Sequence, residues 1–409
     1  MSIKIPNYRV FFQLRLIPRG VWALGLVSLF MDTSSELVHS LLPVFMVTTL
    51  GASKAAVGLI EGIAEATALV VRMFSGVLSD YLRRRKFLTL LGYGLSALTK
   101  PLFPLANSLG LIGAARFFDR IGKGIRGAPR DALLGEIAPE SLRGASFGLG
   151  QALDTVGAFL GPLLAMGGLL LFSGDIRAVL WIAVLPALIS VLILVWGVQE
   201  PESSVQAEKV RNRFKVREVR RLGSTYWGIV LVGGFLALAR FGGAFLILKA
   251  SVSGVPMTFI PLVMVGLNVV YAAAVYPAGV LSDLVSRKIV VLIGALMLVG
   301  ANLVLSGAGG VGALTCGLVL WGLHLAFSEG VLAAMITDVS SSDLRGTAFG
   351  VFSLISGMAT LVSSVGAGLL WDAFGVSAMF LVGAACAVLA FIGAVVFLYP
   401  TWLQKSADV

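Results

Sequence analysis

Residues 76–80 read Gly-Val-Leu-Ser-Asp, and the same five letters return at residues 279–283. A second match pairs residues 143–148, Arg-Gly-Ala-Ser-Phe-Gly, with residues 345–350, Arg-Gly-Thr-Ala-Phe-Gly. The two matches are offset by 203 and 202 residues, about half of the 409-residue chain. Two matches at nearly one offset indicate an internal duplication, so the sequence predicts two halves with the same fold and orientation.

The sequence around these repeats is strongly apolar. Hydrophobic residues make up 58% of the chain and charged residues 13%, with a mean hydropathy of +0.96. A water-soluble domain cannot bury that much apolar surface, so soluble enzymes, nucleic-acid-binding domains and disulfide-stapled secreted folds are excluded. The two cysteines, Cys316 and Cys386, lie in apolar runs without the spacing of a metal site.

Apolar stretches of about 20 residues are long enough to cross a bilayer. The sequence predicts twelve such spans, at 21–50, 55–79, 87–108, 109–133, 144–172, 176–198, 225–250, 255–281, 288–306, 311–336, 346–372 and 376–399. The fourth of them is interrupted by charges. We therefore expect an all-α polytopic membrane protein of two six-helix bundles, residues 1–198 and 225–409, joined by a polar linker at 199–224.

Basic residues are concentrated on alternate connections: before span 1, at residues 83–86 and at residues 209–221. Positive charge gathers on cytoplasmic loops, so both termini are predicted to be cytoplasmic. Basic loops beside an anionic leaflet also account for the net charge of +10 without a nucleic-acid partner. The first twenty residues lack the features of a cleaved signal peptide.

The repeated segment contains a recognisable loop signature. Gly76, Asp80, Arg84 and Arg85, and at the repeat Gly279, Asp283, Arg287 and Lys288, match the pattern Gly-x-x-x-Asp-(Arg/Lys)-x-Gly-Arg-(Arg/Lys). Tyr81 and Leu284 stand where the pattern has a base, and Arg83 and Ser286 where it has glycine. With this signature after spans 2 and 8, the chain resembles the major facilitator superfamily over essentially its whole length, in a poorly characterised prokaryotic branch.

The resemblance implies a secondary transporter of a prokaryotic inner membrane that works as a monomer, without cofactor or metal. It implies that the loop signature latches the cytoplasmic ends of the two halves. Arg143 and Arg345, each before a glycine at a helix start, are then expected to be gate residues that contact Asp80 and Asp283 or nearby helix ends.

Span 5 approximates the antiporter motif of proton-coupled exporters in the same superfamily. The matching residues are Gly148, Gly157, Gly161 and Pro162, while Ala165-Met166 stand in place of the closing glycine pair. Small residues also permit close packing of membrane helices, so packing alone is an equal alternative.

Ionisable residues within the spans mark candidate sites, because a charge at the bilayer centre costs at least roughly 2.5 kcal/mol. Asp32, Glu36 and His39 follow at i, i+4 and i+7 on one face of span 1, and Glu61 and Glu65 repeat that spacing in span 2. Closely spaced acids cannot both ionise cheaply, so these four acids are candidates to carry a proton, with Asp32 and Glu36 first. The alternative is permanent ion pairing of the acids with Arg72, Arg116 and Arg120.

The candidates for solute binding lie mainly on spans 1, 4, 7 and 10, which the resemblance places around the central cavity. They are His39, Arg116, Arg120, Arg240, Asn268, His324 and Glu329. Arg116, Arg120 and Lys123 share one face of span 4. For His324 the alternative is a hydrogen-bonded packing residue. Asp154 is expected to pair with span 4 or span 8.

The favoured function is proton-coupled export of a small organic or amphipathic solute by alternating access. Proton-linked uptake of an organic anion at Arg240 and the span 4 bases is one alternative. A non-transporting receptor or assembly protein on the same scaffold is another. An enzyme or an ATP-driven pump is not predicted, because the sequence has neither a zinc-protease motif nor a P-loop.

Overall fold

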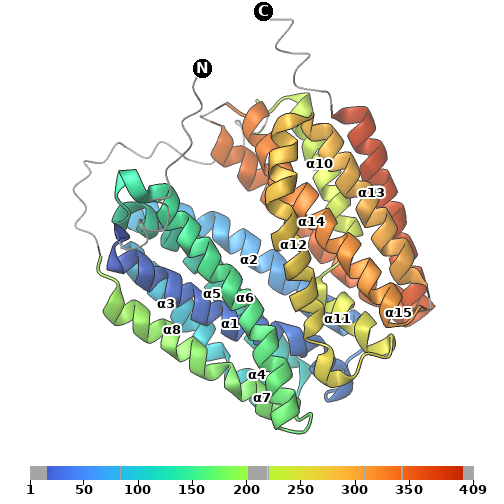
Figure 1. Cartoon of the computed structure of the whole chain (residues 1–409), viewed down its shortest axis with the longest axis horizontal. Helices are drawn as coiled ribbons and strands as arrows, with labels where there is room; N and C mark the ends of the chain where they lie inside the picture. Colours follow the sequence, from blue (N-terminus) through green and yellow to red (C-terminus); the bar gives the residue numbers. More distant parts are fainter. Residues whose placement is uncertain are drawn as a thin grey trace, which may run out of the picture.

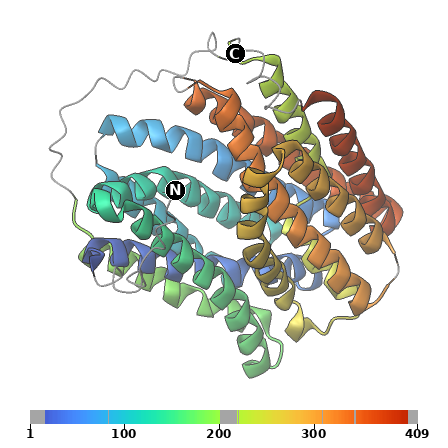
Figure 2. The ribbon, with the colours of Figure 1, turned by 45° about the horizontal axis from the view of Figure 1, so that its top comes forward.

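The chain folds into two helical bundles that lie side by side (Figures 1 and 2). The computed structural model describes residues 16–82, 84–200, 219, 221–307, 309–341 and 344–398, without the side chains of Val77 and Asp80. These residues form helices and turns, with no strand among them. The predicted linker at 199–224 lies largely outside the described residues, as do the bases before residue 16.

The first bundle contains the helices up to residue 197. They are α1 (Arg19–Thr48), α2 (Lys54–Leu82), α3 (Arg85–Thr99), α4 (Leu102–Leu105), α5 (Leu109–Ile137), η2 (Glu140–Leu142), α6 (Arg143–Leu171), α7 (Ile176–Ile182) and α8 (Val184–Gly197). Caps mark some of the helix starts: the Ser108 side chain accepts from Leu111 N at α5, and Asp175 accepts from Arg177 N and Ala178 N at α7.

The second bundle follows from residue 224. Its helices are α10 (Ser224–Ala239), α11 (Gly243–Val252), η3 (Met257–Phe259), α12 (Leu262–Leu284), α13 (Arg287–Ser306), α14 (Val311–Val339) and α15 (Arg345–Phe397). Helix α15 is interrupted at Gly375, whose φ of 84° lies in the left-handed region that favours glycine. Because 53 residues reach more than twice the bilayer core, α15 provides two crossings.

The all-helical membrane fold is confirmed, and the helices are consistent with twelve crossings. Eight described helical segments are long and apolar enough to cross a bilayer, with α7 and α8 joined, α10 and α11 joined and α15 counted once. The other crossings are α2 and α5, which carry many charges, and α3 with α4, which are short. The charges of span 4 do not break it, since α5 is continuous over 29 residues.

The seventh span is broken, although the sequence predicts one continuous helix over 225–250. Helix α10 ends at Ala239 and α11 begins at Gly243, with Arg240 in a non-helical conformation between them. Interrupted membrane helices expose backbone groups beside cavities and binding sites. The break therefore places Arg240 at an irregular point of the second bundle.

The two bundles pack together at one end and diverge at the other (Figure 1). Helix α2 lies against α15 from Lys54, which meets Gly368, to Leu69, which meets Gly357. We call the end around residues 49–56 and 368–375 the closed end. The opposite end, where α1 begins and α15 finishes, is the open end.

A carboxylate from the second half caps a helix of the first half at the closed end. The Asp372 Oδ1 accepts from Lys54 N at 3.1 Å, and its Oδ2 accepts from Ala55 N at 2.8 Å. These amides belong to the first turn of α2, which has no intrahelical acceptor for them and carries the positive end of the helix dipole. The contact can exist only while the two halves meet here.

Replacing Asp372 with alanine should therefore favour opening of the closed end. A lost cap is worth about 1 kcal/mol, so the open fraction should rise roughly fivefold. Ser364 is buried in the contact between α2 and α15, so a Ser364→Cys thiol, in a variant lacking Cys316 and Cys386, reports opening by its rate of maleimide labelling. Asp175→Ala is the control, because Asp175 caps a helix of its own half. Equal labelling rates in the two variants would contradict the prediction.

Candidate functional site

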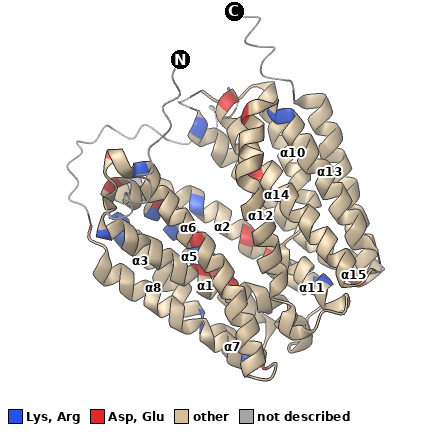
Figure 3. Cartoon of the chain, in the orientation of Figure 1, with Lys and Arg blue, Asp and Glu red and all other residues tan. Residues whose placement is uncertain are grey.

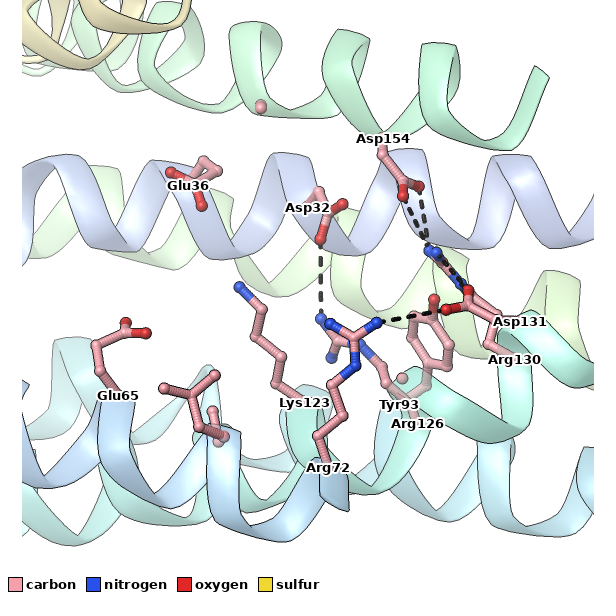
Figure 4. Close-up of a pocket in the computed structure, with 14 residues that line it drawn as sticks. Asp32, Glu36, Glu65, Arg72, Tyr93, Lys123, Arg126, Arg130, Asp131 and Asp154 are labelled. Atoms are coloured by element: carbon pink, nitrogen blue, oxygen red, sulfur yellow. Dashed lines mark hydrogen bonds and ion pairs between the residues drawn. The ribbon is translucent and has the colours of Figure 1, made fainter. Parts of the chain in front are cut away.

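A cavity of about 380 Å³ lies among the helices of the first bundle (Figure 4). Helices α1, α2, α3, α5 and α6 line it, and most of the lining residues are charged. The acids are Asp32, Glu36, Glu65, Asp131 and Asp154, and the bases are Arg72, Lys123, Arg126 and Arg130. Charged side chains gather on this bundle far more than on the second one (Figure 3).

Small residues bring α6 close enough to α1 to form one wall of the cavity. A Cβ on Gly157 would lie 2.5 Å from the Leu29 carbonyl oxygen, and one on Gly161 would lie 2.6 Å from the Thr33 carbonyl oxygen. Pro162 is buried beside them, whereas a Cβ on Gly148 would meet nothing within 4 Å. The packing role of Gly157 and Gly161 is thus direct, and a role of the motif in antiport stays a prediction.

Glu61 is held in a buried ion pair and does not line the cavity. Arg116 Nε and Nη2 donate to the two Glu61 carboxylate oxygens at 3.1 and 2.7 Å. The side chains are only 1% and 4% exposed. Geometry of this kind is the bidentate pairing expected of Arg with a carboxylate. Arg116 therefore has no free face for a solute, and Glu61 is the acid least suited to exchange a proton.

Arg120 is likewise occupied by an acid. Its Nη2 lies 3.2 Å from Glu65 Oε1, and its side chain is 3% exposed. Glu65 is 36% exposed and lines the cavity. Ion pairs of Glu61 with Arg116 and of Glu65 with Arg120 thus join α2 to α5, which is the ion-pairing alternative that the sequence left open. Arg120 is not exposed for solute binding.

A third buried pair was not predicted. Lys100, between α3 and α4, donates from Nζ to Asp119 Oδ1 at 2.9 Å and to Ser35 Oγ at 3.1 Å. Lys100 and Asp119 are 1% and 4% exposed. A lysine directly before Pro101 in an apolar run was the signal in the sequence, because a membrane span places a charge there only with a partner.

Asp32 lines the cavity and is only loosely paired. Its Oδ1 lies 3.8 Å from Arg126 Nη2, beyond hydrogen-bond distance. Arg126 donates from Nη1 to Ser96 Oγ at 2.9 Å and stacks over the Tyr93 ring at 4.6 Å. Arg126 is thus anchored by groups other than Asp32.

Asp154 pairs with α5, which is span 4, one of the two spans predicted as its partner. Arg130 Nη1 lies 3.1 and 3.2 Å from its two carboxylate oxygens. Arg130 also donates to Asp131 at 2.9 Å and to Ser28. Arg72 Nη2 lies 3.5 Å from Asp131 Oδ2, with both side chains substantially exposed. These residues extend the charged lining from the middle of α1 toward the open end.

Glu36 and Lys123 differ from the other charges in the cavity. Glu36 Oε2 lies 3.5 Å from His39 Nδ1 on the next turn of α1, as the spacing predicts. His39 itself lies against Gly243 at the start of α11. Lys123 projects into the cavity, and within the described part of the chain it makes neither a hydrogen bond nor an ion pair (Figure 4).

The predicted binding residues of the second half do not line the charged cavity of the first bundle. Arg240 Nη1 donates to Glu329 Oε1 at 2.8 Å, so these two residues neutralise each other. The Asn268 side-chain amide reaches the Ala158 carbonyl oxygen at 3.5 Å, across the two halves. His324 is fully buried with Nδ1 2.9 Å from the Gly294 carbonyl oxygen, because α14 turns this face to α13. His324 is a packing residue and does not reach the cavity.

The loop signatures form ion pairs inside each half. Arg85 Nη1 lies 2.8 Å from Glu136, and Arg287 pairs with Asp338. Asp283 and Arg84 are exposed. The Asp80 side chain lies outside the described residues, so its predicted contact with Arg143 or a helix end stays a prediction, as does that of Asp283 with Arg345. At the open end the latch would join helix ends that stand apart here.

Comparison with known proteins agrees with this architecture. A model of the Major Facilitator Superfamily matches residues 24–268. An uncharacterized MFS-type transporter of Methanocaldococcus jannaschii is 31% identical over 365 residues, 87% of this chain and 89% of the relative. The chain belongs to the major facilitator superfamily. It is thus a multi-pass membrane transporter of that superfamily and not an enzyme.

Further similarities are to a mycobacterial protein and to solved transporter structures. An uncharacterized protein of Mycobacterium tuberculosis is 29% identical over 361 residues, 87% of each chain. Among solved structures, a mutant of the nucleoside transporter NupG has a TM-score of 0.77 at 14% identity and covers 93% of this chain and 100% of its own. A POT family transporter in complex with 5-aminolevulinic acid has a TM-score of 0.76 at 13% identity, with 93% and 96% covered. These structures support the superfamily fold.

Proposed function

We propose that this transporter couples the export of a small organic or amphipathic solute to the entry of protons by alternating access. The observation that carries the proposal is the different pairing of the four acids of α1 and α2. Glu61 and Glu65 are held by Arg116 and Arg120, whereas neither Asp32 nor Glu36 is hydrogen-bonded to an arginine. Acids that line a cavity without a committed base are suited to take up and release a proton.

Charged groups from four helices face Asp32 and Glu36. Helix α5 contributes Lys123 and Arg126, α6 contributes Asp154 and α2 contributes Glu65, while His39 belongs to α1 itself. Binding of a solute among these groups changes the field at both acids, and a cationic group would compete directly with a proton. Competition of this kind is what an antiporter requires, because proton and solute must occupy the cavity in turn.

The arrangement of the halves supports alternating access. The halves meet at the closed end, and the charged lining extends toward the open end. The positive-inside pattern of the sequence supports a cytoplasmic open end, with both termini on that side. On that topology the structure represents the inward-facing state, in which an exporter takes up its solute.

The proposal is tested with everted membrane vesicles that hold a proton gradient. Addition of a transported solute should dissipate the gradient, read with a pH-sensitive dye, for members of a panel of organic cations, zwitterions, anions and neutral dyes. Asp32→Asn and Glu36→Gln should each reduce this response at least tenfold, because the amides cannot carry the proton. Glu140→Gln, in the exposed turn before α6, is the control and should respond as the native protein does.

Two results would contradict the proposal. Solute flux without any proton response would separate transport from proton coupling. A full response in both Asp32→Asn and Glu36→Gln would show that neither acid carries the coupled proton. The direction of flux relative to vesicle orientation distinguishes export from uptake.

Uptake of an organic anion together with a proton is the second candidate. Lys123 favours it, since an unpaired ammonium in a cavity attracts anions. Arg240 does not support this candidate, because its guanidinium is paired with the Glu329 carboxylate.

A further inference from the structure

The basic residues of α5 differ in whether a carboxylate lies near them. Arg116, Arg120, Arg126 and Arg130 each lie within 4 Å of a carboxylate oxygen. Lys123 is the exception among the described bases of this helix. A cation inside a membrane protein is costly without a partner, which makes the exception informative.

Each acid around Lys123 lies within 4 Å of another base. The side chain points across the cavity toward α1 (Figure 4). Of the acids on that side, Asp32 is shared with Arg126 and Glu36 with His39. Glu65, on the opposite side, is taken by Arg120. The ammonium therefore faces open cavity volume.

Glu36 is the matching exception among the acids. Its nearest base is His39, at 3.5 Å, and no guanidinium is bound to it. The cavity therefore presents one weakly committed acid and one uncommitted base on facing helices, α1 and α5. Among the other lining acids, Asp32 lies 3.8 Å from Arg126, and Glu65, Asp131 and Asp154 are each paired with an arginine.

We propose that the solute carries both an anionic group, bound by Lys123, and an ammonium group, bound by Glu36. This solute class rests on the proposed transport function and narrows it. A volume of about 380 Å³ is near the lower end of small-molecule sites, which suits an amino acid or a compound of similar size. The ammonium competes with a proton for Glu36, and this competition couples solute exit to proton entry.

Four forms of phenylalanine and of alanine provide the probes. The free amino acid carries both charges, the amide only the cation, the N-acetyl form only the anion and the N-acetyl amide neither. Binding to the purified full-length protein in detergent is read as the rise in unfolding temperature with probe concentration, at one fixed pH. The native protein should bind the zwitterion of at least one series about tenfold more tightly than either singly charged form, as expected for charged hydrogen bonds.

Two variants remove the two preferences separately. Lys123→Gln should bind the zwitterion no better than the amide, and Glu36→Gln should bind it no better than the N-acetyl form. Lys123→Arg should keep the preference for a carboxylate. Lys86→Gln is the matched control, because Lys86 lies outside the cavity and its Nζ donates to the Val195 carbonyl oxygen.

The empty protein gives an independent measurement. If Lys123 is unpaired, ligand-free Lys123→Gln should unfold at or above the native temperature. A clear drop, accompanied by coupling to Glu36→Gln in a double-mutant cycle, would show a structural ion pair and overturn the proposal.

The binding data can also overturn it. Equal affinity for the zwitterion and a singly charged form, or no stabilisation by any probe at tens of millimolar, would do so. Preference for the N-acetyl form would favour anion uptake instead. Because this assay needs neither transport nor a gradient, its failure leaves proton-coupled export standing if the vesicle response is intact.

Discussion

Replacing Glu61 with alanine should destabilise the protein by about 3–5 kcal/mol, the typical cost of stranding one partner of a buried ion pair. The guanidinium of Arg116 is 1% exposed and makes two hydrogen bonds to the Glu61 carboxylate. Without that carboxylate it is left with Glu65 and Asp119, each at 3.9 Å. Thermal unfolding of the purified protein in detergent measures the loss.

A double-mutant cycle separates pairing from loss of packing. Arg116→Met combined with Glu61→Ala removes both charges and should recover a large part of the stability lost in Glu61→Ala alone. Glu140→Ala, at an exposed position, should unfold close to the native temperature. Additive effects of the two core substitutions would show that Glu61 and Arg116 act independently.

Adding one methyl group at Gly368 should force the closed end apart. A Cβ there would lie 2.6 Å from Ala55 Cα and would overlap the Lys54 carbonyl oxygen, and both atoms belong to the opposing helix backbone. Backbone atoms cannot move aside as a flexible side chain can. Gly368→Ala should therefore deplete the conformation described here, and labelling of the Ser364→Cys thiol by a water-soluble maleimide should accelerate at least tenfold.

Gly366→Ala is the matched control for this substitution. Gly366 lies two residues away on the same helix, and the substitution adds the same methyl group. A Cβ at Gly366 would meet nothing within 4 Å. Its labelling rate should equal that of the native background. Equal rates in Gly368→Ala and Gly366→Ala would mean that α2 and α15 do not form the closure in the membrane.

The sequence was sufficient for the fold because the relevant signals are long. Apolar spans, a duplicated loop segment and alternating basic connections extend over the whole chain. Local breaks were harder to predict. The interruption at Arg240 has no proline, and the adjacent Gly242-Gly243 resembles the many other glycines of the spans.

The site could be predicted as a set of charges but not as a set of partners. The acids of α1 and α2 and three bases of α5 were identified, because each is anomalous in an apolar span, whereas Arg126 and Arg130 were not identified as site residues. Which base pairs with which acid depends on helix rotation and on distances between helices, and these follow from packing of small residues such as Gly157. For the same reason the sequence left His324 open between solute binding and packing, and in the structure α14 turns it toward α13.

Gene duplication starts from two copies of identical chemistry, yet the charges that line the cavity all come from residues before 160, within the first copy. The second copy retains the Arg240–Glu329 pair and is otherwise mostly uncharged within its spans. Such a division of labour has a consequence for how these proteins acquire new cargoes. Mutations that change cargo choice should arise in the first copy, and a chimera that takes its second copy from the Methanocaldococcus jannaschii relative should keep the selectivity of its first.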